Sequence, residues 1–197
     1  MVPKRNYLIH PQYIILTLTI ASVTALFLSF TGAYLYNRIQ QGVIPVEIPT
    51  MFYFNTLIII ASSATLVYAK RCYLDDETDR FKVALWVTMF LTIAFLILQV
   101  LAWKQMTDQN IKVNSSTMAS YMYLISGVHF LHLVAGIPFL GHFIYVAYKR
   151  MKDPVTVLIY FTDPDKKRLL NLLNIYWHFL DGLWIYLVLF FLLNYLI

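Results

Sequence analysis

Charged side chains are scarce in this sequence of 197 residues, where Asp, Glu, Lys and Arg together make up only 13%. A typical soluble domain carries about 25% charged residues. Hydrophobic residues make up 60% of the chain, which excludes an ordinary soluble domain and indicates a membrane protein. The alternating ten-residue strands of a membrane β-barrel are also missing. We therefore predict an all-α fold, a polytopic membrane helix bundle.

Cysteine is almost absent as well, since Cys72 stands alone and an internal disulfide is excluded. The sequence has no GxGxxG, phosphate-binding loop, CxxC or HExxH pattern, so it lacks the usual signatures of nucleotide, redox and zinc enzymes. No internal repeat and no inverted pair of broken helices is visible, which disfavours a secondary transporter. The first apolar run is too long for a signal-peptide core, so we expect no cleavable signal.

Long apolar runs account for most of the chain. Each is long enough for a helix to cross about 30 Å of hydrocarbon at about 1.5 Å per residue. The connecting loops are short, so we expect a single membrane domain over residues 1–197. The predicted transmembrane helices cover about 13–36, 51–69, 83–103, 119–148 and 169–195.

Basic residues are distributed unequally between the two sets of loops. With the N-terminus placed in the cytoplasm, twelve of the 15 lysines and arginines fall in cytoplasmic segments. The remaining three, Arg38, Lys104 and Lys112, fall outside. Cytoplasmic loops of membrane proteins carry an excess of Lys and Arg, so this distribution predicts an N-in, C-out orientation.

Asp181 is the one acidic residue deep inside a predicted span, and His178 lies three residues before it. Ionisable groups at this depth cost at least a few kcal/mol unless they are paired or buried in protein. Together with Asn171 and Asn174 they fall within an arc of about 80° on a helix. We expect this polar stripe to face protein, with Asp181 and His178 as partners at i, i+3.

Two more histidines, His129 and His132, share one face of the fourth run with Gly136. The glycine allows a neighbouring helix to approach closely. The second run offers Asn55 near its outer end. The tryptophans that bracket the Asp181 pair, Trp177 and Trp184, are as compatible with core packing as with function.

Spacing alone leaves three interpretations of these polar groups open. They could supply axial histidines to a haem, drawn from His129, His132 and His178. They could form a proton path through His178 and Asp181. They could also be polar contacts that fix helix pairing within a larger assembly, which is the interpretation we favour because one isolated acid makes a poor proton chain. A metal site built from these residues would lack the usual combination of ligands found in protein metal sites.

The last helix carries a motif that resembles subunit III of haem–copper terminal oxidases. In that family the pattern Tyr/Phe-Trp-His-Phe-x-Asp-x-x-Trp recurs in the final helix. The segment SGVHFLHLVAG and the segment VEIPTMFYFNTLIIIASS are similar to two further motifs of the family. The positions that carry the resemblance are Tyr176, Trp177, His178, Phe179, Asp181 and Trp184; Gly127, His129, Leu131, His132 and Gly136; and Glu47, Pro49, Asn55, Thr56, Ser62 and Ser63.

The resemblance runs in order from about residue 45 to the end, and it matches the short five-helix bacterial form that lacks the first two helices of the seven-helix form. It departs from the family in the first helix, where a glutamate is usual. Here the run 13–36 contains no acid, and the aligned position is Leu26. Any role of that glutamate is therefore in doubt for this chain.

The resemblance implies a non-catalytic subunit of a proton-pumping cytochrome c oxidase in the bacterial cytoplasmic membrane. It implies no catalytic, cofactor-binding or metal-binding residue in this chain, with haem and copper expected in partner subunits. The expected partners are catalytic subunit I, other oxidase subunits, bound phospholipid and a wider respiratory supercomplex, but not nucleic acid. The candidates for structural polar or lipid contacts are Asn55, His129, His132, Trp177, His178, Asp181 and Trp184.

Two alternative functions stay open at this point. One is subunit III of a quinol oxidase, because the choice of electron donor lies in other subunits. The other is an independent haem-binding electron-transfer protein of the membrane.

Overall fold

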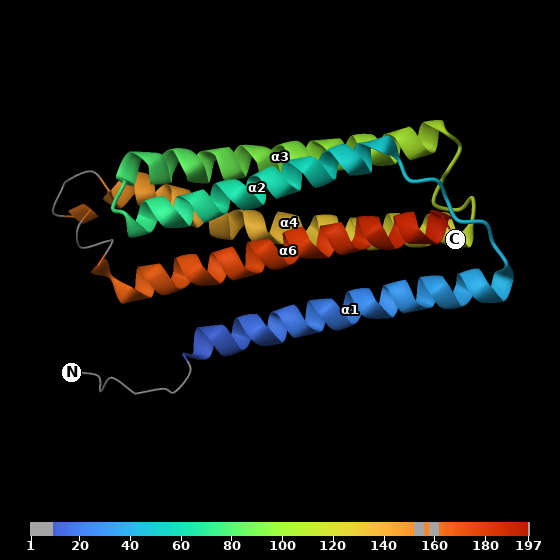
Figure 1. The fold of residues 1–197 in the computed structure, drawn as a ribbon, viewed down its shortest axis with the longest axis horizontal. Coiled ribbons are helices and arrows are strands. Elements are labelled where there is room, and N and C mark those ends of the chain that lie inside the picture. Colours follow the sequence, from blue (N-terminus) through green and yellow to red (C-terminus); the bar gives the residue numbers. More distant parts are fainter. Residues whose placement is uncertain (1–9, 152–155, 158–161, 197) are drawn as a thin grey trace.

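The computed structural model describes residues 10–151, 156–157 and 162–196. Within these residues there are five long helices and no strand, which confirms the all-α membrane bundle (Figure 1). Each helix is long and apolar enough to cross a membrane. The five are α1 (Pro11–Gln41), α2 (Thr50–Leu74), α3 (Thr78–Asp108), α4 (Thr117–Arg150) and α6 (Pro164–Leu196).

Each helix contains one of the ranges expected from hydropathy and extends beyond it at both ends. The extensions are polar turns that local chemistry stabilises. His10 accepts a hydrogen bond from the Gln12 backbone N–H at the start of α1, and Ser116 does the same for Ala119 at the start of α4. Gly42 ends α1 in the left-handed conformation, which glycine adopts without steric cost.

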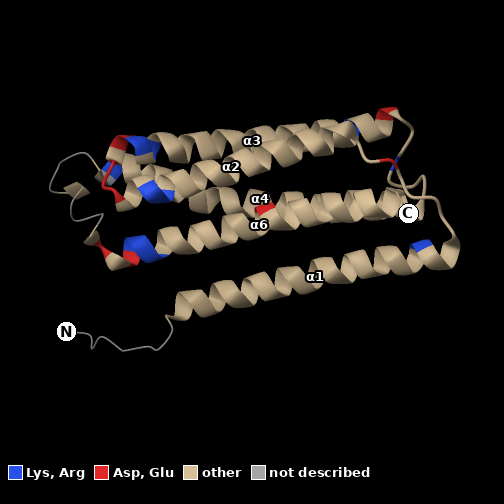
Figure 2. Ribbon diagram, in the orientation of Figure 1, with Lys and Arg blue, Asp and Glu red and all other residues tan. Residues whose placement is uncertain are grey.

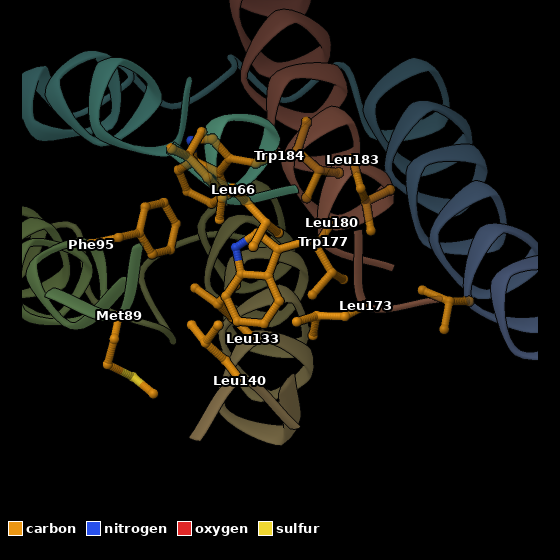
Figure 3. Close-up of a cluster of buried hydrophobic side chains, with 14 of the residues drawn as sticks. Leu66, Met89, Phe95, Leu133, Leu140, Leu173, Trp177, Leu180, Leu183 and Trp184 are labelled. Atoms are coloured by element: carbon orange, nitrogen blue, oxygen red, sulfur yellow. The ribbon is translucent and has the colours of Figure 1, made fainter. Parts of the chain in front are cut away.

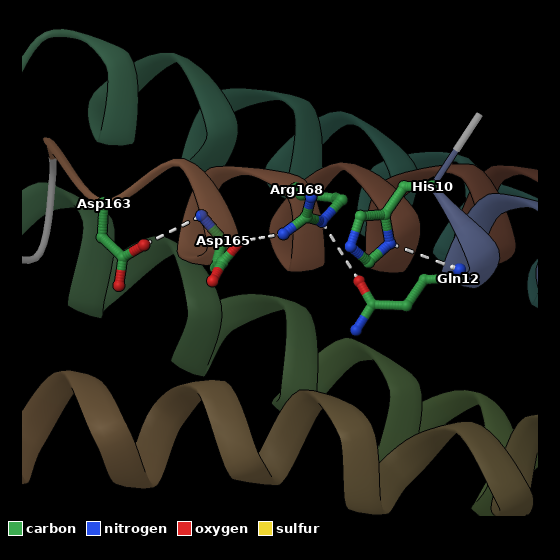
Figure 4. Close-up of polar contacts among 5 residues, drawn as sticks. All are labelled: His10, Gln12, Asp163, Asp165 and Arg168. Atoms are coloured by element: carbon green, nitrogen blue, oxygen red, sulfur yellow. Dashed lines mark hydrogen bonds and ion pairs between the residues drawn. The ribbon is translucent and has the colours of Figure 1, made fainter. Parts of the chain in front are cut away.

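The start of α6 is tied to the start of α1 by a short polar network (Figure 4). The Asp163 carboxylate accepts a hydrogen bond from the Asp165 backbone N–H at 2.8 Å. Arg168 pairs with the Asp165 carboxylate and donates to the Gln12 side-chain oxygen at 3.2 Å. The N-terminal ends of the two helices are therefore held at the same end of the bundle.

The helices α2 and α3 form an antiparallel pair, α4 and α6 lie against it, and α1 lies along the edge of the bundle (Figure 1). The main contacts of α1 are with α4 and α6. Only 17% of the residues in its most apolar stretch are buried, against 44% in α6. Most of the α1 surface therefore remains available to lipid or to another chain.

The hydrophobic core sits where α2, α3, α4 and α6 meet (Figure 3). Trp184 of α6 is fully enclosed, with its ring 5.0 Å from that of Phe95 and 5.2 Å from that of Phe52. Trp177 lies about two turns before Trp184 on the same face of α6; it is equally buried and packs against α4. These two indoles are the largest buried side chains, so they anchor α6 in the bundle.

Charged residues gather at the two ends of the bundle, and lysine and arginine are concentrated at the end where the N-terminus lies (Figure 2). One acidic position stands apart from both ends, near mid-length. This is Asp181 of α6, the position that the sequence identifies as a buried acid.

Candidate functional site

Buried polar side chains are spread along the interior of the bundle rather than gathered at one catalytic centre. They come from all five helices, and most lie on faces that meet another helix. Those buried among the described residues are Thr31, Asn55, Ser62, Thr88, Thr92, Gln99, Ser126, His129, Asn174, Asp181 and Asn194.

Asn55 forms a fully buried amide pair with Gln99. Its side-chain N–H donates to the Gln99 side-chain oxygen at 2.9 Å, which joins α2 to α3. A second bond between these helices connects the hydroxyls of Thr65 and Thr88 at 2.9 Å. Polar pairs of this kind fix the register of two helices in hydrocarbon, where no water competes.

Two tryptophan indole N–H groups make further hydrogen bonds between helices, which include α4 and α6. The Trp184 indole N–H donates to the Thr56 hydroxyl at 3.2 Å, which links α6 to α2. The Trp103 indole donates to the Ser126 hydroxyl at 3.0 Å, which links α3 to α4. Trp184 thus has a definite polar partner as well as its place in the core.

His129 lies fully buried between aromatic rings. Its ring centroid is 5.1 Å from that of Trp184 and 6.0 Å from that of Phe95. Neither ring nitrogen has a hydrogen-bond partner among the described residues. The neighbouring rings fill the space around the imidazole, so a porphyrin does not fit against His129 without repacking the core.

His132 and Gly136 both lie where α4 contacts α6, and they contribute to this contact in different ways. The Nδ1 atom of His132 lies 2.7 Å from the Val128 carbonyl oxygen of its own helix. The Tyr176 hydroxyl donates to the His132 carbonyl oxygen at 3.1 Å. A Cβ atom at Gly136 would lie only 3.1 Å from the ring of Trp177. The close approach of a helix at this glycine, expected from the sequence, is therefore present.

His178 and Asp181 do not pair with each other, contrary to the sequence-based prediction. The Nδ1 atom of His178 lies 2.7 Å from the Ser63 hydroxyl oxygen, so this histidine joins α6 to α2. Both carboxylate oxygens of Asp181 are buried without a hydrogen-bond partner among the described residues. The i, i+3 spacing allows a pair within the helix, but His178 instead contacts the Ser63 hydroxyl on the neighbouring helix.

A groove between α2 and α6 passes over His178 and Asp181. It has a volume of about 480 Å³, and it opens to the outside of the chain. Asp181 is 96% buried, so its side chain forms part of the groove wall rather than a surface acid. The lining residues are Ile60, Ser63, Ala64, Val67, His178, Asp181, Gly182 and Ile185.

The polar contacts that hold α1 were not predicted from the sequence. The Thr31 hydroxyl lies 3.0 Å from the Tyr186 hydroxyl. Arg38 donates to the Asn194 side-chain oxygen at 2.9 Å. The only signal in the sequence is the presence of Thr31 and Arg38 on an apolar helix, and it does not show which helix lies opposite.

The candidate residues do not come together as a metal or haem site. Among the residues that the structure describes, no group of three or more His, Cys, Asp or Glu side chains is close enough to hold a metal ion. His132, His178 and the enclosed His129 each have different contacts: a backbone carbonyl of α4, the Ser63 hydroxyl and aromatic rings, respectively. The arrangement is that of helix-to-helix contacts inside a bundle.

The fold and this interior define a polytopic membrane protein whose buried polar groups join helices. A family model described as cytochrome c oxidase subunit III matches residues 15–195. Since this match covers most of the chain, the protein belongs to the cytochrome c oxidase subunit III family.

Individual relatives agree with the family assignment. The Bacillus subtilis (strain 168) protein named cytochrome c oxidase subunit 3 is 24% identical over 139 residues, which is 70% of this chain and 62% of that protein. The protein of the same name from Alkalihalophilus pseudofirmus is 24% identical over 169 residues, 83% of this chain and 77% of that protein. The Mus musculus protein is 24% identical over 143 residues, and this chain spans 49% of its length.

Proposed function

We propose that the chain is the non-catalytic subunit III of a bacterial proton-pumping cytochrome c oxidase. The observation that carries this proposal is the family match over residues 15–195. The interior supports a role in assembly, because several of its polar side chains bond across helix contacts. Haem and copper then belong to the partner subunits.

The electron donor in this proposal is cytochrome c rather than quinol. The support is that the relatives from B. subtilis and A. pseudofirmus are both named cytochrome c oxidase subunit 3. Donor choice resides in other subunits, so it is measured on the whole complex rather than on this chain.

The proposal places the chain as a single domain in the bacterial cytoplasmic membrane, with its N-terminus inside. The basic residues support this orientation, because they gather at the end of the bundle where the N-terminus lies (Figure 2). The catalytic subunit and the other oxidase subunits are its partners. A respiratory supercomplex containing this oxidase is the wider assembly.

We also propose that phospholipid binds at the C-terminal end of α1. A groove of about 600 Å³ is lined there by Leu35, Ile39 and Leu193, with Arg38 at its side. Apolar walls suit acyl chains, and a guanidinium beside them suits a phosphate headgroup.

The candidate polar residues have structural roles in this proposal. Asn55, His178 and Trp184 fix α2 against α3 and α6 through the bonds described above. His129, His132 and Trp177 fill the contact of α4 with α6. These contacts keep the shape of the surface that the catalytic subunit recognises.

Purification through a tag on this chain tests the proposal. After extraction of native membranes in mild detergent, we expect stoichiometric recovery of a many-span, haem-bearing chain that oxidises cytochrome c. Activity with a quinol but not with cytochrome c would change the donor. Recovery of the chain alone would contradict the proposal.

A further inference from the structure

Asp181 is a buried acid whose two carboxylate oxygens can accept more hydrogen bonds than the described part of the chain offers. Its residue is 4% exposed, and neither carboxylate oxygen has a partner. Ser63 lies beside the carboxyl and can donate one hydrogen bond to it, but this single hydroxyl is shared with Nδ1 of His178 at 2.7 Å and cannot satisfy both carboxylate oxygens. A carboxyl left without a partner in a low-dielectric interior is costly, so a donor from outside the chain would stabilise it.

The groove between α2 and α6 gives a donor from another chain access to Asp181. Asp181 shares this groove with three small residues, Ser63, Ala64 and Gly182. Gly182 is exposed, and a Cβ atom added there would meet nothing within 4 Å. Small residues along a membrane-facing groove let a second helix approach closely.

The depth of the groove decides between the classes of occupant. Asp181 lies near the middle of α6, roughly 25 Å from Pro164 and roughly 22 Å from Leu196. Lipid headgroups stay about 15 Å from the bilayer centre, and acyl chains carry no hydrogen-bond donor. Water is absent from the hydrocarbon core. A helix of another chain is therefore the occupant that the depth of Asp181 favours.

We propose that the groove between α2 and α6 is the docking site for a transmembrane helix of the haem-bearing oxidase subunit, which donates a hydrogen bond to Asp181. This rests on the proposed function, because it takes the occupant from the complex to which the chain is assigned. The donor is a side-chain N–H or O–H on that helix, and Gly182 sets the distance of closest approach.

A leucine at Gly182 tests the docking without disturbing the fold of the chain. The Gly182→Leu side chain has free space on its own chain but fills the groove, so we expect recovery of the haem-bearing subunit to fall at least tenfold. Gly32→Leu is the matched control, because Gly32 is exposed on α1 and its added Cβ also meets nothing within 4 Å. Full recovery with Gly182→Leu would overturn the proposal, as would equal loss with Gly32→Leu.

Photocrosslinking identifies the occupant in the assembled membrane. A photoreactive phenylalanine analogue replaces Ile60, which lines the groove and is half exposed, or Leu131, which is exposed on α4 outside the groove. An adduct with the haem-bearing subunit from Ile60 but not from Leu131 is the expected result. An adduct only with a second copy of this chain, or no protein adduct, would overturn the docking proposal. If the unmodified chain recovers no haem-bearing subunit at all, the proposed function itself fails.

Discussion

The four helices α2, α3, α4 and α6 and the edge helix α1 are held in different ways. Among the four, fully buried aromatic rings interlock, and buried amides and indoles find partners across the helix contacts. The edge helix is more apolar than α2, α4 and α6, but only 17% of its most apolar stretch is buried. It is attached by a few aromatic contacts, such as those of Tyr34, and by single polar bonds at intervals.

The difference shows that hydropathy and packing are separate properties in this chain. A helix of high hydropathy crosses the membrane whether or not it packs against its own chain, because lipid satisfies its surface. The four-helix body, defined as α2, α3, α4 and α6, supplies its own interior. The exposed faces of α1 are left for lipid or for other chains. We expect substitutions in the body to affect melting strongly and those on α1 to act locally.

The largest effect should come from the indole at the centre of the body. Trp184→Ala removes the ring that packs on Phe52 and Phe95, and we expect it to destabilise the chain by about 3 to 5 kcal/mol. Thermal melting of the purified chain in mild detergent measures this loss. Trp86→Ala is the matched control, because Trp86 is half exposed on α3. Similar melting of both variants would contradict the central place of Trp184.

A smaller loss is expected at the closest approach of α4 and α6. Gly136→Leu would drive a side chain into the rings of Tyr176 and Trp177, at a cost of about 1 to 3 kcal/mol. Gly127→Leu is the control, since a Cβ there meets nothing within 4 Å. Melting temperatures should fall for the first variant and stay near the parent value for the second. A larger fall in melting temperature for Gly127→Leu than for Gly136→Leu would contradict the close contact of α4 and α6 at Gly136.

The buried amide pair should contribute less than either packing feature. Asn55→Leu leaves the Gln99 amide without its partner, and we expect a loss of about 1 kcal/mol. The double variant with Gln99→Leu removes both polar groups and should recover part of the loss. A double-mutant cycle on melting provides the coupling energy. Additive effects of the two substitutions would mean that the amides do not interact.

The smallest effect is expected on α1, where it sharpens the contrast. Arg38→Met removes the hydrogen bond to Asn194, which we expect to contribute about 0.6 kcal/mol. Hydrogen exchange at the C-terminal end of α1 should increase, while the melting of the body stays unchanged. A drop in melting as large as that of Trp184→Ala would contradict the separate attachment of α1.

The sequence was sufficient to predict the five helices, because long apolar runs leave few alternatives in a membrane. It also predicted that Gly136 would lie at a close helix contact and that Asn174 and Asp181 would be buried. It could not show which helix faces which. Asn55 and Gln99 were visible as polar residues on separate helices, but their pairing depends on the packing of α2 against α3.

The same reason explains the wrong pairing of His178 with Asp181. Residues at i, i+3 share a helix face, but a side chain bonds to whichever partner the neighbouring helix supplies. Ser63 on α2 is that partner for His178, and nothing in the local sequence of α6 indicates it. The attachment of α1 was missed for a similar reason, since Arg38 and Asn194 are distant in sequence.

We propose that this chain acts by packing within an oxidase and holds no redox centre of its own. The most direct test is to separate the tagged chain from its purified complex and to measure haem and copper in each fraction. We predict that both remain with the many-span partner and that the separated chain has no Soret band. A Soret band that stays with this chain and disappears in His129→Ala or His178→Ala would contradict the claim.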